Sequence, residues 1–441
     1  MPPNSRDHRR LSALLAANRR PHASQLWVNG RGLALPTQHR GGAVAMAQAT
    51  AAFDAEPLIL SYHLKKIPLP PPIEPGPPDP ASGEEPPAAS PFTFDEQACY
   101  QSLRRRVAAW QREQGIRDLY APAAYLYLWV VHVLSLLGAN LGALYAATHG
   151  RWPLVYACAA LASTLRALML LREAHAATHY TVVASPRLNN LISQWSWGMI
   201  SVQCADRLNA SHVEIHHLYT STPQLDDAAF PGVRTSAAEK HRPWNYLQPI
   251  YFLPVYALVL FFTPLEEWWE LATRRRYAGR RALNLLFSVA FALFYYAGAL
   301  VTGDVLWLLA AVCPASLILA CTFAVNHQVI PCAQAADDHA LHQAILQHRK
   351  TVDFGRYQVA LTPNHSEESW WINQLFGGLN HHRTHHLFPK VHYHYYPALT
   401  KIINAALQEQ GVPTVTYPSF PAALAAHWEL IRLRSRPEPA K

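Results

Sequence analysis

Long runs with almost no charged side chains limit what this chain can fold into. Residues 122–148, 152–171, 282–303 and 305–326 contain only His132 and Arg166 among acidic, basic and histidine side chains. An α-helix needs about 20 residues to cross a bilayer, and the length of each run is close to this number or above it. A soluble all-α protein would have to bury four such helices, and a charged fraction of only 15% argues against that alternative. The runs therefore predict four transmembrane helices.

A fifth apolar run, residues 247–264, is interrupted by Pro249, Pro254 and Pro264. Because proline removes a helical hydrogen bond, we expect this segment to be interfacial or re-entrant. The connections at 149–151 and at Asp304 are short enough only for hairpin tips. The sequence thus predicts an all-α, multi-pass integral membrane protein, whose four transmembrane helices form two hairpins beneath a cytoplasmic helical cap.

The basic residues have a membrane explanation. The net charge is +8, and arginine clusters at 104–106 and 274–281 lie just before predicted spans. The positive-inside rule places both clusters in the cytoplasm, so no nucleic-acid partner is needed to explain them. We also predict a basic amphipathic helix at residues 95–114. It is either a surface helix of the cap or, as we favour, a helix that lies on the membrane.

Composition divides the chain into four parts. Residues 68–91 contain 11 prolines in 24 positions, which indicates an extended linker. The linker separates a small unit, 1–67, from the main domain, 92–420, and residues 421–441 are predicted to be a polar tail. The six cysteines are scattered without a CxxC pair, so we expect them to be reduced.

Three histidine clusters lie beside the ends of the predicted spans. They comprise His175 and His179; His212, His216 and His217; and His382, His385 and His386, with His327 as a ninth candidate. Spacings of three or four residues place the side chains of a cluster on one helix face, close enough to share a metal. Because each predicted hairpin returns the chain to its starting side, all nine would face the cytoplasm, provided that 247–264 does not cross.

Nine imidazoles exceed what one ion needs, so we expect two metal ions. Imidazole suits zinc, copper, iron and nickel, and the ligands alone do not name the metal. The absence of an HExxH motif argues against a zinc hydrolase. Each ligand needs an acceptor for its second ring nitrogen, and Asp226, Asp227, Glu173 and Glu214 are the nearby candidates.

These clusters resemble the histidine boxes of the membrane fatty acid desaturases, a non-haem diiron family. The runs GGLNHHRTHHLFP at 377–389 and HYYPAL at 394–399 are most similar to the front-end branch, and HHLYT at 216–220 is similar to its second box. The resemblance covers residues 93–410. It implies that the eight box histidines, and more loosely His327, are ligands of two iron ions.

Three positions depart from the family pattern. Ala176 stands where the first box usually has Asp, Val213 where the second usually has Asn, and His382 where the front-end branch has Gln. Every ligand position is still filled by histidine. The departures therefore bear on regiochemistry and rate, and the metal site is expected to be retained.

The resemblance implies an oxygen-dependent desaturase that introduces a cis double bond into a long acyl chain, carried on CoA or on a lipid. Its implied partners are O2, an electron donor of the cytochrome b5 and reductase type, and a membrane. We expect the endoplasmic reticulum, with the metal site facing the cytoplasm. The alternatives are an acyl-chain hydroxylase with the same diiron site and a non-catalytic membrane protein that binds lipid or metal.

The N-terminal unit resembles a shortened cytochrome b5 domain, a small α+β fold. The similarity rests on WVNGR at 27–31, HRGG at 39–42, Phe53 and SYH at 61–63. By this resemblance His39 and His63 would be the axial ligands of haem b. Arg40 replaces the usual Pro, and a remnant without haem is the alternative.

Overall fold

We describe the protein from a computed structural model. The structure describes residues 25–28, 31–34, 56–62, 92–95, 98–198, 205, 209–222, 226, 232–273, 281–338, 341 and 351–438. The N-terminal part contributes the antiparallel strands β1 (Gln25–Val28) and β2 (Arg31–Ala34) and helix α3 (Glu56–Tyr62). The predicted haem ligands His39 and His63 lie outside the described residues, so the cytochrome b5-like unit and its haem stay predictions.

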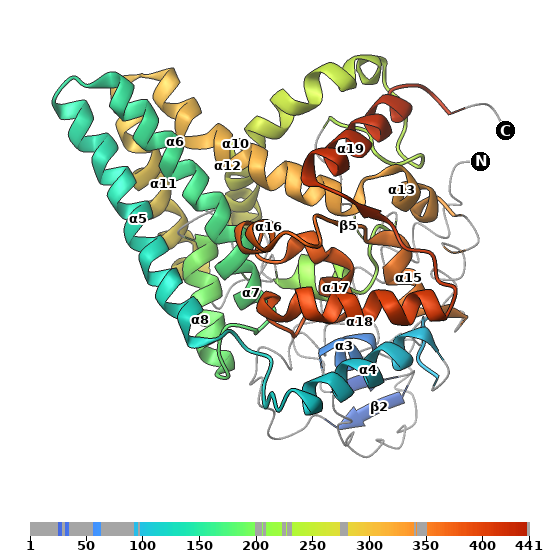
Figure 1. The fold of residues 1–441 in the computed structure, drawn as a ribbon. Coiled ribbons are helices and arrows are strands. Elements are labelled where there is room, and N and C mark those ends of the chain that lie inside the picture. Colours follow the sequence, from blue (N-terminus) through green and yellow to red (C-terminus); the bar gives the residue numbers. More distant parts are fainter. Residues whose placement is uncertain are drawn as a thin grey trace, which may run out of the picture.

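Four helices form a bundle on one side of the molecule (Figure 1): α5 (Ala123–Thr148), α6 (Trp152–Met169), α11 (Arg281–Thr302) and α12 (Val305–His327). Short turns join α5 to α6 and α11 to α12, and each pair lies side by side. Small residues allow the close packing. A Cβ atom at Gly298 of α11 would lie 2.3 Å from the Trp307 ring of α12, so only glycine fits there.

By length and composition, four helices in the described residues could cross a membrane: Ala123–Thr148, Trp152–Thr178, Pro243–Phe262 and Val305–His327. The third of these replaces the predicted span 282–303, whose described apolar part, Ser288–Thr302, is shorter. The prediction that prolines interrupt 247–264 is wrong, because α10 (Gln248–Thr273) is one unbroken helix. Pro249 falls in its first turn, where the amide has no helical partner. Pro254 and Pro264 are accommodated within the helix.

The histidine centre limits which helices can cross. His179 follows the candidate span Trp152–Thr178 and His327 ends α12, and both belong to the centre described below. An even number of crossings must separate them, so α10, α11 and α12 cannot all cross. Helix α10 lies along α12, where the Leu260 N–H donates to Ser316 Oγ at 2.9 Å. The arrangement of four spans in two hairpins stays a prediction.

Arg166 of α6 is buried within the bundle. Its side chain is 1% exposed, and its guanidinium carbon lies 4.2 Å from the centre of the Tyr295 ring of α11. Nη1 donates to the carbonyl of Ala311 in α12 at 3.1 Å. The only charge in the predicted span 152–171 therefore ties three helices together.

A helical cap adjoins the bundle. Its core lies among α4 (Cys99–Glu113), α15 (Phe354–Leu361), α17 (His382–Leu387) and α18 (Tyr396–Glu409). Leu103 and Val107 of α4 are buried, and α4 packs on α15 and α18. The prediction that this apolar face lies on the membrane is wrong, because the cap itself covers it. Asp353 accepts a hydrogen bond from the Cys99 N–H at 2.6 Å and so caps the helix at its observed start.

Short parallel strand pairs fasten distant parts of the chain to the cap. Strand β3 (Phe92–Thr93) pairs with β4 (Val352–Asp353), and β5 (Asn364–His365) pairs with β6 (Thr416–Tyr417). The first pair precedes α4 and α15, and the second brackets the third histidine box. These connections hold the box-bearing segments in a fixed register with the cap.

The segment predicted as a polar tail, 421–441, contains a packed helix. Helix α19 (Phe420–Arg434) lies against α10, α12 and α13 (Ile330–Ala336). Leu430 and Ile431 are buried, and Arg434 forms an ion pair with Asp337. Apolar residues on one face of a mixed sequence bury this helix against the bundle.

Candidate metal centre

The first box stands where α6 leaves regular helical geometry. After Met169 the chain forms a π-helical turn, η1 (Leu170–Ala174), and continues as α7 (His175–Thr178). A π-turn holds an extra residue and turns the following side chains relative to the helix before it. His175 and His179 are thereby presented on the cap side of the bundle, and both are buried.

The second box is itself π-helical. Element η3 (Asn209–His216) carries it, and the His217 N–H donates to the His212 carbonyl five residues earlier at 3.0 Å. A π-helix has a wider turn, with hydrogen bonds from i to i+5. The ring nitrogens of His212 and His217 belong to one group, described below, and that of His216 belongs to another.

Two glycines place the third box. Gly377 and Gly378 precede the short 3₁₀-turn η6 (Leu379–His381) and α17, and both have positive φ, 57° and 76°. A Cβ atom at Gly377 would lie 2.2 Å from the Leu171 carbonyl oxygen, and one at Gly378 would lie 2.4 Å from Tyr393 Cβ. Only glycine lets this turn pack directly on η1, which brings the third box against the first.

These elements bring all nine predicted histidines together in two groups. The first group contains His175, His179, His212, His217 and His385, and the second contains His216, His327, His382 and His386. Within each group the ring nitrogens that could bind a metal lie within 4.8 Å of one another. Neither group includes a carboxylate or a cysteine from the described residues. The groups adjoin, since the rings of His217 and His386 stack with centroids 4.3 Å apart.

The boxes are divided between the two groups. The expectation that each cluster shares one metal is wrong for the second and third boxes. His216 belongs to the second group, whereas His212 and His217 belong to the first. In α17, His382 and His386 are four residues apart on one face, whereas His385 faces the first group. Each of these boxes therefore links both groups.

The spacing of the ring nitrogens fits a shared cation. The Nε2 atom of His212 lies 2.9 Å from that of His175, 3.0 Å from that of His179 and 3.3 Å from that of His217. A single N–H cannot donate to three acceptors at once. Nitrogen ligands bind a metal at 2.0–2.1 Å, so neighbouring ligands of one ion lie about 3 Å apart. The first group has this geometry, and the donor set suits iron.

Hydrogen bonds fix the outer nitrogens of four rings. The Nδ1 atom of His216 lies 2.8 Å from Asp226 Oδ2, and that of His386 lies 3.0 Å from Gln358 Oε1. The Nδ1 atom of His385 lies 3.0 Å from the Tyr396 hydroxyl, and that of His327 lies 3.1 Å from the Leu361 carbonyl oxygen. Carboxylate and carbonyl oxygens only accept, so they require an N–H at Nδ1. The Nε2 lone pair then points inward as a ligand.

Burial keeps the centre uncharged. Desolvation, reinforced by the neighbouring imidazoles, lowers the pKa far below the ordinary 6.5 for six rings: His179, His212, His217, His382, His385 and His386. Burial alone would raise the pKa of Asp226, but the nearby His216 and the Ser221 N–H outweigh it and hold that pKa below its ordinary value. Neutral forms of these six rings and an ionised Asp226 are the protonation states that metal ligation requires.

His381 lies outside both groups. It is buried, and its Nδ1 atom lies 2.9 Å from Thr400 Oγ1. Of the predicted outer partners, Asp226 contacts a box histidine, whereas Glu173 lies beside Arg172 at 3.4 Å. Asp227 and the side chain of Glu214 lie outside the described residues.

Sequence reasoning missed Gln358, Tyr396 and Leu361 as outer partners. Tyr396 belongs to the run that resembles the family, which was a usable signal. Gln358 lies on α15, a helix without a box, and the Leu361 contact uses the backbone, so neither carries a mark in the sequence.

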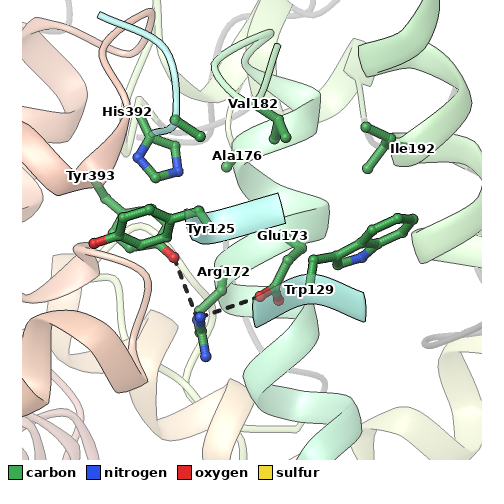
Figure 2. A pocket seen from close by; sticks show the side chains of 10 residues that line it. Tyr125, Trp129, Arg172, Glu173, Ala176, Val182, Ile192, His392 and Tyr393 are labelled. Carbon is green, nitrogen blue, oxygen red and sulfur yellow. Dashed lines mark hydrogen bonds and ion pairs between the residues drawn. The ribbon is translucent and has the colours of Figure 1, made fainter. Parts of the chain in front are cut away.

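A small cavity adjoins the first box (Figure 2). It lies between the start of α5, the η1–α7 segment, α8 (Pro186–Ser196) and the residues after the third box, and Trp129, Glu173 and Ala176 line it. On one wall Arg172 donates to the Tyr393 hydroxyl at 3.4 Å. Ala176, where the first box usually has Asp, forms part of this wall. That departure therefore changes the lining of the cavity and leaves the histidine groups complete.

Comparison with known proteins shows the family of this chain. The sequence model of the fatty acid desaturase family matches residues 151–418. The acyl-lipid (7-3)-desaturase of Rebecca salina is 29% identical over 364 residues, which cover 78% of this chain and 75% of that protein. The sn-1 linoleoyl-lipid 6-desaturase of Synechocystis is 25% identical over 355 residues, 74% of this chain and 92% of that protein. The acyl-lipid (8-3)-desaturase of Physcomitrium patens is 45% identical over 71 residues, 16% of this chain and 15% of that protein.

Proposed function

Because this chain belongs to the fatty acid desaturase family, and is therefore an oxidoreductase that desaturates fatty acyl chains, we propose that it introduces a cis double bond into a long acyl chain carried on a lipid. Two iron ions held by the nine histidines would be its cofactor. The single observation that carries the proposal is the pair of adjoining, carboxylate-free histidine groups. A lipid carrier is favoured over CoA because the relatives are named as acyl-lipid and linoleoyl-lipid desaturases.

The reaction requires a cofactor and an electron source. Its balance is R–CH2–CH2–R′ + O2 + 2 e⁻ + 2 H⁺ → R–CH=CH–R′ + 2 H2O. No side chain can take hydrogen from an unactivated C–H bond, so iron and oxygen supply that chemistry when bound. The two external electrons would come from a donor of the cytochrome b5 and reductase type.

The protein's own residues would hold and insulate the centre. His216, fixed by ionised Asp226, and His386, fixed by Gln358, present Nε2 lone pairs without rotational freedom. All the residues of the two groups are histidines, and an imidazole ligand carries no negative charge. The positive charge of the ions would therefore not be offset by the ligands themselves. Burial of most of the rings keeps bulk water away from the reacting carbon atoms.

We further propose that the cap and its centre face the cytoplasm. Arg104, Arg105 and Arg106 belong to α4, which packs within the cap. Such clusters favour the cytoplasmic side of a membrane. For a eukaryotic source this orientation corresponds to the endoplasmic reticulum with a cytoplasmic electron donor.

Expression in a host without polyunsaturated fatty acids tests the function. Candidate fatty acids are fed, lipid classes are separated, and the products are analysed by mass spectrometry. A new double bond, first detected in lipid-bound chains and absent with His386→Ala, is the expected result. A hydroxylated product would identify the hydroxylase alternative, and unchanged lipids with a fully metal-loaded protein would contradict the proposal.

A further inference from the structure

Helix α15 carries no histidine box, yet it contacts both the second and the third box. Gln358 is fully buried at its centre. Its Oε1 atom lies 3.0 Å from His386 Nδ1, and its Nε2 atom donates to the His217 carbonyl oxygen at 2.9 Å. A carbonyl can only accept, so the second contact fixes which end of the amide is nitrogen. Oε1 is therefore the atom that faces His386, and it accepts from the ring.

This contact selects one tautomer of His386. With Nδ1 protonated, Nε2 carries the lone pair, and Nε2 of His386 has no hydrogen-bond partner among the described residues. The Thr220 hydroxyl lies 3.0 Å from Gln358 Oε1 and 3.3 Å from His386 Nδ1, so it helps to hold the Gln358 amide beside the His386 ring. The Nε2 atom of His386 is thus a buried ring nitrogen without a partner, and it lies in a group of four histidine rings. A metal ligand is expected at such a position.

The end of the same helix repeats the arrangement. The Leu361 carbonyl accepts from His327 Nδ1 at 3.1 Å. Two of the four rings in the second group, those of His386 and His327, are thus oriented from α15. In the first group, the outer nitrogen of His385 contacts the Tyr396 hydroxyl of α18 and not α15.

Helix α15 is itself firmly held. Asp353 caps it by accepting from the Arg356 N–H at 2.9 Å, and the same carboxylate caps α4. The Tyr357 hydroxyl donates to the Thr220 carbonyl at 2.6 Å, next to the second box. The orientation that α15 gives to the rings is therefore fixed by contacts outside the metal centre.

We propose that Gln358 is a positioning residue that holds the ion of the second histidine group through His386, and that this ion depends on α15 more than the ion of the first group does. The proposal rests on the proposed function to the extent that both groups bind metal. Outer-shell partners of metal-bound histidine typically contribute 10-fold to 100-fold to metal affinity. Gln358 should therefore affect the second ion by that factor and the first ion much less, because it contacts His217 of the first group only at the backbone carbonyl.

The test titrates metal-free full-length protein in detergent with Co²⁺ and follows the absorption of the bound ion. Wild type should bind two ions. Gln358→Met, which keeps the volume but removes the side-chain hydrogen bonds to His386, His217 and Thr220, should raise the Kd of the second ion 10-fold to 100-fold and that of the first ion much less. Gln358→Glu, which can still accept from His386, should recover part of that loss. Gln374→Leu is the matched control, because Gln374 accepts a hydrogen bond from the Tyr125 hydroxyl and belongs to neither histidine group, so it should change neither Kd.

Coupling to His386 separates positioning from general damage. In a His386→Ala background, adding Gln358→Met should change the second Kd less than twofold. A second measurement does not depend on how Gln358 variants fold. The nitrogen NMR spectrum of histidine-labelled, metal-free protein should contain an Nδ1–H tautomer signal that His386→Ala removes.

Three results overturn the proposal. The first is a Gln358→Met protein with two unchanged Kd values, which leaves the proposed function intact. The second is loss of both ions together, which indicates a structural role only. The third is an Nε2–H tautomer for His386. A wild-type protein that binds neither Co²⁺ nor iron contradicts the proposed function as well and is thereby distinguished from the other three.

Discussion

The Nε2 atom of His382 lies 2.7 Å from the Nε2 atom of His327. This contact joins the first residue of the third box to the last residue of α12, so a helix of the bundle and a helix of the cap meet in the second group. His382 is also the position where the front-end branch has Gln. The distance shows that histidine at 382 reaches the group in this chain.

We therefore expect His382→Ala to abolish turnover and to reduce bound iron from about two ions to about one per chain. His382→Gln should keep part of both, because an amide oxygen can still bind a metal, although less strongly than imidazole. Metal analysis of purified protein and product analysis by mass spectrometry measure the two effects.

His381→Ala is the internal control. His381 is buried and bonded to Thr400, so its loss should lower stability by about 1–2 kcal/mol while iron content is retained. If iron is lost with His381→Ala and kept with His382→Ala, the assignment of the third box is wrong by one residue.

The second prediction concerns Asp226. Its carboxylate lies 2.8 Å from His216 Nδ1 and also accepts from the Ser221 N–H at 2.7 Å. Asp226→Asn removes the charge that strengthens His216 as a ligand, so we expect the affinity for one ion to fall by about 10-fold. Competition with a chelator measures this effect. Asp118→Asn, at an exposed position, should behave as wild type; an equal loss in both variants would argue against a role for Asp226 in the centre.

The nine histidines could be predicted from the sequence because their spacing and their position beside apolar runs are local properties. Their division between two groups could not. It depends on which distant segments meet each ring: His216 lies with His327, His382 and His386, which come from other parts of the chain. The same limit applies to Gln358, whose partner His386 is 28 residues away.

Helix α10 and helix α19 show a second limit. The prolines at 247–264 predicted an interrupted segment, but the structure has a helix there that packs on α12. Tertiary contacts outweigh local propensity in this helix. The mixed sequence of 421–441 concealed an apolar face with Leu430 and Ile431, which becomes meaningful only when α10 and α13 are beside it.

The third prediction concerns the turn before the third box. Gly378 has a positive φ of 76°, and the Cβ atom that Gly378→Ala adds would lie 2.4 Å from Tyr393 Cβ. The turn or Tyr393 must therefore shift. We expect a loss of about 3 kcal/mol or more, with iron content reduced because the box is displaced. Gly411→Ala has a similar φ of 61° and open space around it. It should cost only about 1 kcal/mol. Thermal unfolding of both proteins measures the difference, and equal losses would show that the close packing does not matter.

The fourth prediction concerns pH and His427 of α19, which lies outside the metal centre. His427 is fully buried, and its Nδ1 atom lies 2.6 Å from the Gln328 carbonyl oxygen, so Nδ1 is the donor. Its Nε2 atom then accepts from the Tyr256 hydroxyl at 2.9 Å. Burial lowers the pKa of His427 from 6.5 to about 4. Protonation of His427 would place a hydrogen on Nε2, so the Tyr256 hydroxyl could no longer donate its hydrogen bond to this atom.

Because the pKa of His427 is lower in the folded state, the unfolded chain binds more protons between pH 6.5 and 4. The stabilisation is complete above pH 6.5 and is lost as the pH falls toward 4; at pH 5 the loss from this one residue is about 2 kcal/mol. The unfolding midpoint of metal-free wild type should therefore fall more steeply from pH 7.5 to 5 than that of His427→Gln. Other histidines titrate in both proteins, so the difference between the two slopes reports His427 alone. Parallel slopes would mean that His427 is not held neutral by its burial between α10 and α12.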